Sequence, residues 1–453
     1  PLRPMPSTVM EVRTMKTYLS KTGILLAVLL VAGAVVAPVM AGEVTKQLSV
    51  PYYEQETNYT CGPAVAQMWI DFHNGYVSQD TLWNCILDNN REGWPMWYTD
   101  PYGLAACVSN YLNNFIAEDC RWSYFSTANI ALAMDIVDMD NSPPALIYSG
   151  DHWVLVKGVS YEDYYGIVQN VYGFWVHDPW EYDINHYYST DDWQDVLTPV
   201  DVDGSHWDGY WTTVRGYWGI DVAGAGCPDT VPTSDEPVAG ENTTRPAVWS
   251  DTLVRPTPTA GVDRETYSNQ LTAYYEAVAK NVTLMADEED DIPLTEDTDL
   301  AAFARQEMNR IKIFQEELEG AVPGEPVFVH SLDEKRHDYY LIPFERDGYI
   351  TVVVQVSIKG DVADFSSAFS PAPKTQNVVR PTLEEARTVL AENGYDSALP
   401  AQLVWKPCEQ TQSSAVPVWE FTVDDGDTVY VGYVPWKKQV EFYEELTMKK
   451  IAG

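Results

Sequence analysis

The chain has 453 residues, of which 45% are hydrophobic and 21% charged, a composition typical of globular proteins. Acidic residues number 67 against 28 basic ones, so the formal net charge is −39. Such a charge repels nucleic acids and anionic membranes, which excludes proteins that act mainly by binding either one. It suits a secreted protein, a calcium-rich surface or a salty medium, and the length predicts two or three domains.

The first 41 residues predict an export signal. Met15 begins a basic stretch, and an apolar run, ILLAVLLVAGAVVAPVMA, follows at 24–41. Val39 and Ala41 place small residues before a cleavage site, so we expect cleavage after Ala41. Residues 1–14 are interpreted as an upstream extension. The alternative is an uncleaved membrane anchor. The expected location is secreted or at the cell surface, with no membrane contact after cleavage.

Changes in composition predict the domain organisation of the remaining chain. Residues 42–227 are rich in aromatic side chains, with helical patterns first and apolar strands later. Residues 228–263 are rich in Pro, Thr and Asp and predict an extended linker. Residues 264–322 predict a helical segment, with helices over 266–285 and 300–320. Residues 323–453 predict a smaller α+β domain.

Cys61 lies at the predicted start of a helix. In CGPAVAQMWIDF, apolar residues recur with the spacing of one buried helical face, and Pro63 falls in the first turn, where proline is tolerated. Backbone N–H groups at a helix N-terminus favour negative charge, which lowers the pKa of a thiol there. The alternative interpretation is a core cysteine or half of a disulfide.

The six cysteines, at 61, 85, 107, 120, 227 and 408, are too few for a disulfide-dense scaffold. They form no CxxC pair, so we expect no structural zinc site. Cys85, Cys107 and Cys120 are close in sequence, which favours a bridge between two of them. If Cys61 is a free nucleophile, one further thiol must also remain unpaired.

A thiolate nucleophile requires a base, a group that orients the base, and donors for the oxyanion. His152 begins the apolar run WVLV, which predicts a buried strand that ends at Gly158. A second aromatic strand, VYGFWVHDPW, ends at Asp178, whose carboxylate is placed to accept from His152. Gln55, six residues before Cys61, supplies an amide donor.

These segments together resemble the extracytoplasmic papain-like cysteine peptidases of the bacteriocin-processing, double-glycine peptidase-like type. VPYYEQETNYTCGPAVAQM, a Gly-x-His-Trp-Val strand and a strand ending in Asp-Pro occur in the order of that family, over about residues 48–200. The resemblance implies an α+β fold in which a cysteine-bearing helix packs on an antiparallel sheet. It also implies that Cys61 is the nucleophile, His152 the base, Asp178 the orienting acid and Gln55 the oxyanion donor.

Three neighbouring features have alternative interpretations. His177 precedes Asp178, and a strand register shifted by one residue turns His177 toward the cleft instead. His206 lies in HWDGYW, which echoes the His152 segment but lacks a buried strand. The loop at 93–103, GWPMWYTDPYG, is interpreted either as the wall of a groove for peptide or sugar, or as a small core of its own.

Residues 325–436 resemble PepSY-type modules, which accompany secreted peptidases. Two hairpins, at 338–358 and 418–433, flank a helix in PTLEEARTVLAENG, where Thr382 and Glu385 have capping-box spacing. The resemblance implies that this module caps the Cys61 cleft in the same molecule. The alternative is a passive spacer or surface-binding domain.

The sequence therefore predicts an exported cysteine peptidase that hydrolyses peptide bonds through a thioester. It implies a peptide or protein substrate, no nucleic acid partner, and no metal or organic cofactor. One alternative is a catalytically idle surface or adhesion protein that binds peptide or glycan with its aromatic loop. An amidase or acyltransferase with the same four side chains is another.

Overall fold

The computed structural model describes residues 42–164, 167–181, 184–218, 283–284, 292–295, 298–371, 375–423, 426–448 and 451–453. The predicted export signal at 1–41 and the predicted linker at 228–263 lie outside these residues, as does most of the helical pattern at 266–285. The end of that pattern is a correction, because Thr283–Leu284 form a short strand, β8, parallel to β5 (Ile167–His177).

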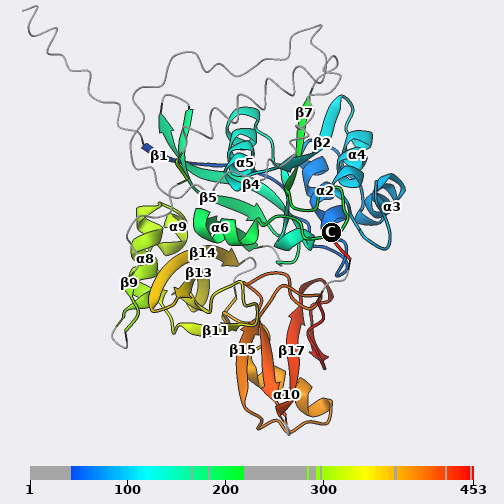
Figure 1. Ribbon diagram of the computed structural model, residues 1–453. Coiled ribbons are helices and arrows are strands. Elements are labelled where there is room, and N and C mark those ends of the chain that lie inside the picture. The colour runs from blue at the N-terminus through cyan, green and yellow to red at the C-terminus, as the bar shows by residue number, and fades with distance from the viewer. Residues whose placement is uncertain are drawn as a thin grey trace, which may run out of the picture. The chain divides into compact units, whose positions relative to one another are not determined.

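The described chain is an α+β structure built on a large mixed sheet (Figure 1). Most neighbouring strands in it are antiparallel. From one edge, the order runs through β2, β7, β3, β4, β5, β6, β14, β13, β12 and β11. The bounds of these strands are β2 Phe115–Trp122, β3 Pro144–Ile147, β4 His152–Tyr164, β6 Ile184–Ser189, β7 Trp211–Trp218, β11 Val327–Ser331, β12 Tyr339–Arg346, β13 Tyr349–Lys359 and β14 Val362–Pro371.

Four further strands form an antiparallel group in the C-terminal part of the chain. They are β15 Ala401–Trp405, β16 Val418–Thr422, β17 Thr428–Val434 and β18 Gln439–Tyr443. They pair antiparallel in chain order, and β15 joins β11 in parallel. Short strands complete the set: β1 Gly42–Gln47 along β4, β9 Ile292–Pro293 along β14, and β10 Val322–Pro323 along β12.

The strand β4 is longer than its apolar run predicts. We expected it to end at Gly158, but pairing continues to Tyr164 beyond a bulge between Val156 and Gly158. A β-carbon at Gly158 would crowd the backbone of Lys46 in the neighbouring strand β1. The glycine therefore permits close approach of a third strand, and does not end the strand that contains it.

Helices cover the N-terminal part of the sheet. They are α2 Cys61–Phe72, α3 Gln79–Asn89, α4 Pro101–Tyr111, α5 Phe125–Met139 and α6 Thr190–Val196. The cysteine helix α2 packs on β4 and on the helices α3 and α4 (Figure 1). Its predicted apolar face is buried, including Val65, Met68 and Trp69. The sequence periodicity thus identified both the helix and the face that packs on the sheet.

The C-terminal part confirms the predicted hairpins and helix. The hairpins are β12–β13 and β16–β17, and the helix is α10 (Leu383–Glu392). Thr382 and Glu385 form the expected capping box, in which each side chain bonds the backbone of the other. The helix predicted over 300–320 is instead two helices, α8 (Leu300–Arg310) and α9 (Gln315–Leu318). Positive φ angles at Lys312 and Phe314 break it, and Phe314 joins the core.

The sheet connects the N-terminal and C-terminal parts. Strand β6 pairs with β14 over five residue pairs, from Ser367 opposite Tyr188 to Pro371 opposite Ile184. One hydrophobic cluster combines Trp175 and Tyr187 with side chains from α8, α9 and β12–β14. The predicted boundaries at 227, 263 and 322 remain predictions, but the two parts share strand pairing and buried surface.

The disulfide-bonded cysteines agree with the prediction from their spacing. Cys85 is bonded to Cys107, a pair within the predicted group, and Cys120 is also disulfide-bonded. Cys61 and Cys408 are buried thiols that are not part of a disulfide. The sequence-based argument that a second thiol stays unpaired if Cys61 is free therefore agrees with Cys408.

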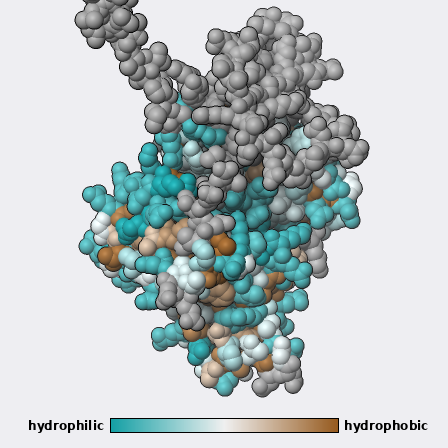
Figure 2. Space-filling view, turned by 60° about the vertical axis from the view of Figure 1, so that its left-hand side comes forward, coloured by the Kyte–Doolittle hydropathy of each residue, from teal (hydrophilic) through white to brown (hydrophobic). Residues whose placement is uncertain are grey.

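The described residues on the face shown in Figure 2 are mostly hydrophilic, with small separate hydrophobic patches. Among the helices of the described residues, none combines the length and the apolar character that crossing a membrane requires.

Trp175→Ala tests whether the two parts unfold together. Removing this buried side chain should lower the free energy of unfolding by about 3–5 kcal/mol. Because its cluster includes residues from both parts, hydrogen exchange monitored by mass spectrometry in urea should show β4 and β13 peptides losing protection at the same, lowered midpoint.

Phe421→Ala is the matched control. Phe421 belongs to a small cluster formed only by residues near α10 and β15–β18. Its substitution should lower protection there first. Retention of the wild-type midpoint by β13 peptides in Trp175→Ala would show that the two parts unfold independently.

Candidate active site

Cys61 is the first residue of α2 and is fully buried. Thr60 precedes it as N-cap but makes no side-chain capping bond to the helix, because its hydroxyl accepts from the backbone N–H groups of Glu56 and Thr57. Cys61 is therefore at a helix N-terminus whose N–H groups have no side-chain cap from Thr60. This location favours an anionic sulfur.

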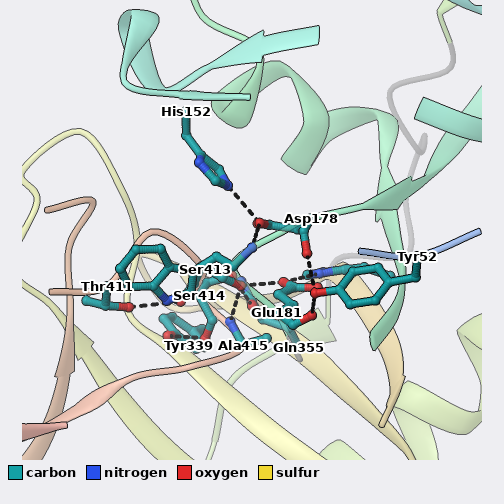
Figure 3. A network of polar contacts seen from close by, with 12 residues as sticks. Tyr52, His152, Asp178, Glu181, Tyr339, Gln355, Thr411, Ser413, Ser414 and Ala415 are labelled. Carbon is teal, nitrogen blue, oxygen red and sulfur yellow. Dashed lines mark hydrogen bonds and ion pairs between the residues drawn. The ribbon is translucent and has the colours of Figure 1, made fainter. Parts of the chain in front are cut away.

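His152 and Asp178 meet where two antiparallel strands end. His152 begins β4, Asp178 directly follows β5, and the pairing of Leu155 with His177 brings these ends together. His152 Nε2 lies 2.7 Å from Asp178 Oδ1, and both side chains have no exposed surface. Asp178 Oδ1 also accepts from the backbone N–H of Trp180 at 2.8 Å, which fixes the carboxylate (Figure 3).

The environment of His152 favours its protonated form. Burial by itself lowers the pKa of His152, but the charge and hydrogen bond of Asp178 raise it, and the interaction with Cys61 raises it further. The net pKa is about 9. Since Nε2 binds Asp178, Nδ1 is the nitrogen available to Cys61. The arrangement is suited to a thiolate–imidazolium pair.

His177 faces away from this pair. Its Nε2 is 3.0 Å from the Val50 carbonyl oxygen, and its ring contacts Tyr52. Burial and the charge of Lys157 lower the pKa of His177 to about 3, against the raising effect of the Val50 bond. His177 is thus a neutral imidazole that donates to a backbone carbonyl, and the register shifted by one residue does not occur.

Gln55 lies in the loop before α2 and is fully buried. Its backbone N–H donates to Pro179 O at 3.0 Å, which ties this loop to the segment after Asp178. The side-chain Nε2 donates to Thr57 O at 2.6 Å. An amide nitrogen carries two hydrogens, so one hydrogen remains for a second acceptor.

A second buried acid, Glu181, supports the segment of Asp178. Glu181 Oε1 lies 2.6 Å from His186 Nδ1 and accepts from the hydroxyl of Ser413. Tyr52 donates both to the Glu181 carbonyl and to the Asp178 carbonyl, the latter at 3.1 Å (Figure 3). Burial raises the pKa of Glu181, and the neighbouring His186 and Ser413 oppose this rise.

Side chains of the C-terminal part also pack close to the pair. The ring of Trp436 contacts Trp180 at a centroid distance of 4.5 Å. The guanidinium of Arg336 lies 4.8 Å from the centroid of Tyr148, whose ring is stacked 6.5 Å from that of His152. His152 and Asp178 are therefore enclosed by residues of the C-terminal part, which follow position 330, as well as by residues of the N-terminal part.

A pocket of about 470 Å³ adjoins the site. One wall is the loop at 56–59 that follows Gln55, together with Trp180. The other is formed by the C-terminal part, including Glu409, Trp436 and Tyr443. This space could receive part of a ligand.

Other sequence candidates lie elsewhere. His206 Nε2 is 2.8 Å from a guanidinium nitrogen of Arg91, and its backbone N–H donates to Glu92 at 2.5 Å, so it belongs to a surface loop contact. In the described ranges, no group of three or more His, Cys, Asp or Glu side chains could hold a metal ion.

The sequence did not identify Glu181 and Ser413, which support the segment that carries Asp178. Glu181 has a local signal, because it is an acid only three residues after Asp178 in an aromatic, otherwise apolar segment. Ser413 has none, since 232 positions separate it from Glu181 and only the fold brings them together.

Comparison with known protein families matches residues 47–200 to the Peptidase_C39 like family. This range contains Gln55, Cys61, His152 and Asp178. The match places a C39-like peptidase domain in the N-terminal half of the chain, and the family suggests cysteine peptidase activity with peptide substrates. No curated protein matches the chain.

The pH dependence of Cys61 alkylation tests the ion pair. If the imidazolium persists until pH rises through about 9, the iodoacetamide rate should change less than about threefold between pH 6 and 8. An ordinary thiol of pKa about 8.5 reacts about tenfold faster per pH unit over this range. Rates are read at each cysteine by peptide mass spectrometry.

His152→Ala should restore the steep dependence, whereas His177→Ala should keep the flat profile because His177 is neutral and bonds Val50. A steep profile in the unmodified protein would contradict the ion pair.

Proposed function

We propose that the chain is an exported papain-like cysteine peptidase that cuts peptide bonds with Cys61, His152 and Asp178. The observation that carries this proposal is the bond of His152 Nε2 to Asp178 at 2.7 Å, which leaves Nδ1 for Cys61 at the start of α2. The match of residues 47–200 to a peptidase family supports it independently.

The proposed chemistry begins with the thiolate of Cys61 attacking the substrate carbonyl carbon. The carbonyl oxygen becomes an oxyanion, which the remaining Gln55 N–H and the backbone N–H of Cys61 would stabilise. His152 then gives its Nδ1 proton to the leaving amine, and the C–N bond breaks to leave a thioester. A water molecule, deprotonated by His152, attacks the thioester and releases the acid and the thiol.

Asp178 acts through His152. Its bond to Nε2 fixes the ring orientation and stabilises the positive charge that the ring carries before each proton transfer. The fully buried location excludes water and strengthens this attraction. The proposed mechanism thus uses these side chains, the backbone N–H of Cys61 and water.

Substitutions of Gln55 test the oxyanion role. Gln55→Ala should lower kcat by about 10²–10³-fold, as loss of one oxyanion donor does in acyl transfer. Gln55→Glu should be at least as impaired, because a carboxylate retains the shape and loses the N–H donors. Cleavage is measured by mass spectrometry on a pool of peptides from digested protein, and Cys61→Ala should abolish it.

Gln67→Ala serves as the matched control. Gln67 is also a buried glutamine, on α2, but its Nε2 donates to Val77 O at 2.9 Å and its Oε1 accepts from Gln79 at 3.2 Å, so it bonds to neither His152 nor Asp178. Its activity per folded molecule should remain near that of the unmodified chain. Equal activity of the Gln55 and Gln67 variants would remove Gln55 from the mechanism, and no Cys61-dependent cleavage would leave a protein that binds peptide or glycan.

We also propose that the protein acts outside the cytoplasm. The apolar segment at 24–41 supports this, as does the Cys85–Cys107 disulfide, since disulfides persist in oxidising compartments. N-terminal sequencing of the exported protein should begin at Gly42, and Ala41→Arg should block that cleavage. A chain that keeps residues 24–41 would indicate a retained anchor.

The C-terminal part is proposed to regulate the peptidase, in keeping with its resemblance to PepSY-type modules. Support comes from the cation–π contact of Arg336 with Tyr148 and the edge-to-face contact of Trp436 with Trp180, which bring this part to the edge of the site. We propose that a segment of this part regulates the peptidase by competing with substrate for the site.

A further inference from the structure

The last three described residues, Ile451-Ala452-Gly453, form backbone hydrogen bonds like those of a bound peptide. The N–H of Ala452 donates to Met96 O at 3.1 Å, and the Ala452 carbonyl accepts from the N–H of Tyr98 at 2.9 Å. Trp97 and Ala452 form a parallel β-bridge. Extended peptides bind many proteins in this way, by adding a strand to an exposed backbone edge.

The next residue bonds to the segment that carries the catalytic histidine. The N–H of Gly453 donates to Gly150 O at 2.8 Å, and Gly150 is two residues before His152. Consecutive residues of the tail thus bond to two separate parts of the peptidase domain, the loop at 96–98 and the turn before β4. The tail lies between them.

The side chains show that this place is close to Cys61. Ala452 is buried in the same hydrophobic cluster as Cys61, Trp97 and Trp153. Thr99 lies between the tail and the start of α2. Its side chain packs against Gly62, the neighbour of Cys61, and its backbone packs against Gly453. Figure 1 accordingly shows the C-terminal end beside α2.

Only glycine fits at position 453. A β-carbon there would overlap the carbonyl oxygen of Thr99, and the backbone has a φ of +83°, which other residues rarely adopt. The Thr99 oxygen cannot easily move away, since it accepts a bond from Trp153 Nε1 at 3.1 Å. The place that the tail occupies between the loop at 96–98 and Gly150, called the channel below, therefore accepts only glycine at position 453.

We propose that Ile451–Gly453 is a built-in occupant of the substrate cleft, which closes the peptidase until it is displaced. The inference rests on the proposed function, since it assigns the groups at 96–98 and Gly150 to the backbone of a peptide substrate. A substrate needs the same N–H and carbonyl groups, so tail and substrate exclude each other.

The chain keeps the tail close to its channel. Thr447 is tied to the C-terminal part by bonds between its carbonyl and Glu409 N and between its N–H and the Gln410 side chain, each 2.9 Å. A tethered segment has an effective concentration in the millimolar range. The pocket of about 470 Å³ has none of the tail-binding residues in its lining, so it stays available while the tail is bound.

The rate of Cys61 alkylation measures occupancy without requiring activity. Deletion of 451–453 from the full chain should raise the iodoacetamide rate at Cys61 by about tenfold or more, because a millimolar cis occupant keeps the channel closed most of the time. Cys408, a buried thiol in a different hydrophobic cluster from Cys61, provides the internal reference. The synthetic peptide MKKIAG, added to the deletion variant, should reverse the increase, whereas MKKIAA should not.

Gly453→Ala provides a point substitution in case the deletion affects folding. Its β-carbon should expel the tail and raise the Cys61 rate as the deletion does. Gly394→Ala is the matched control: φ at Gly394 is +91°, yet a β-carbon there meets no atom within 4 Å. It adds backbone strain far from the channel and should leave the Cys61 rate unchanged.

The outcomes separate this inference from the proposed function. Faster alkylation with faster Cys61-dependent cleavage supports both. Faster alkylation without cleavage of any peptide supports the occupant and overturns the peptidase assignment. Unchanged alkylation in both the deletion and Gly453→Ala overturns the occupant, while cleavage that requires Cys61 would still support the peptidase.

Discussion

The hydrogen bond between His152 and Asp178 is the constraint on which the site depends. Both groups are fully buried, so neither charge is stable there without the other. The hydrogen bond forms only while the ends of β4 and β5 stay together, and neighbouring contacts hold Asp178 in place. Trp180 N–H holds the carboxylate, and the Tyr52 hydroxyl holds the carbonyl of the same residue.

Burial of this pair is a product of the whole described chain. Ser413 bonds to Glu181, Arg336 lies over the ring of Tyr148, and Trp436 contacts Trp180 edge-to-face. The strand pairing of β6 with β14 joins the two parts in one sheet. A low-dielectric, water-excluding site thus comes from the C-terminal part, which supplies no catalytic group in the proposed mechanism. The same enclosure leaves a substrate little room unless something moves.

Much of the site could be predicted from the sequence because its signals are local. The apolar spacing after Cys61 identified the helix and its buried face, and the run after His152 identified a buried strand. The capping box at Thr382 and the hairpins on either side of α10 were predicted for the same reason. The helix predicted at 300–320 failed where periodicity conflicted with packing, since Phe314 turns into the core.

Sequence alone predicted most of the elements and proposed four residues for the site, because helix and strand periods, caps and turns depend on neighbours along the chain. Tertiary structure decided which acid bonds to His152 and that β4 continues beyond Gly158. It also decided that Ser413 bonds to Glu181 and Gly453 to Gly150. These contacts join residues far apart in the chain, and no local pattern records which partner the folded backbone brings near.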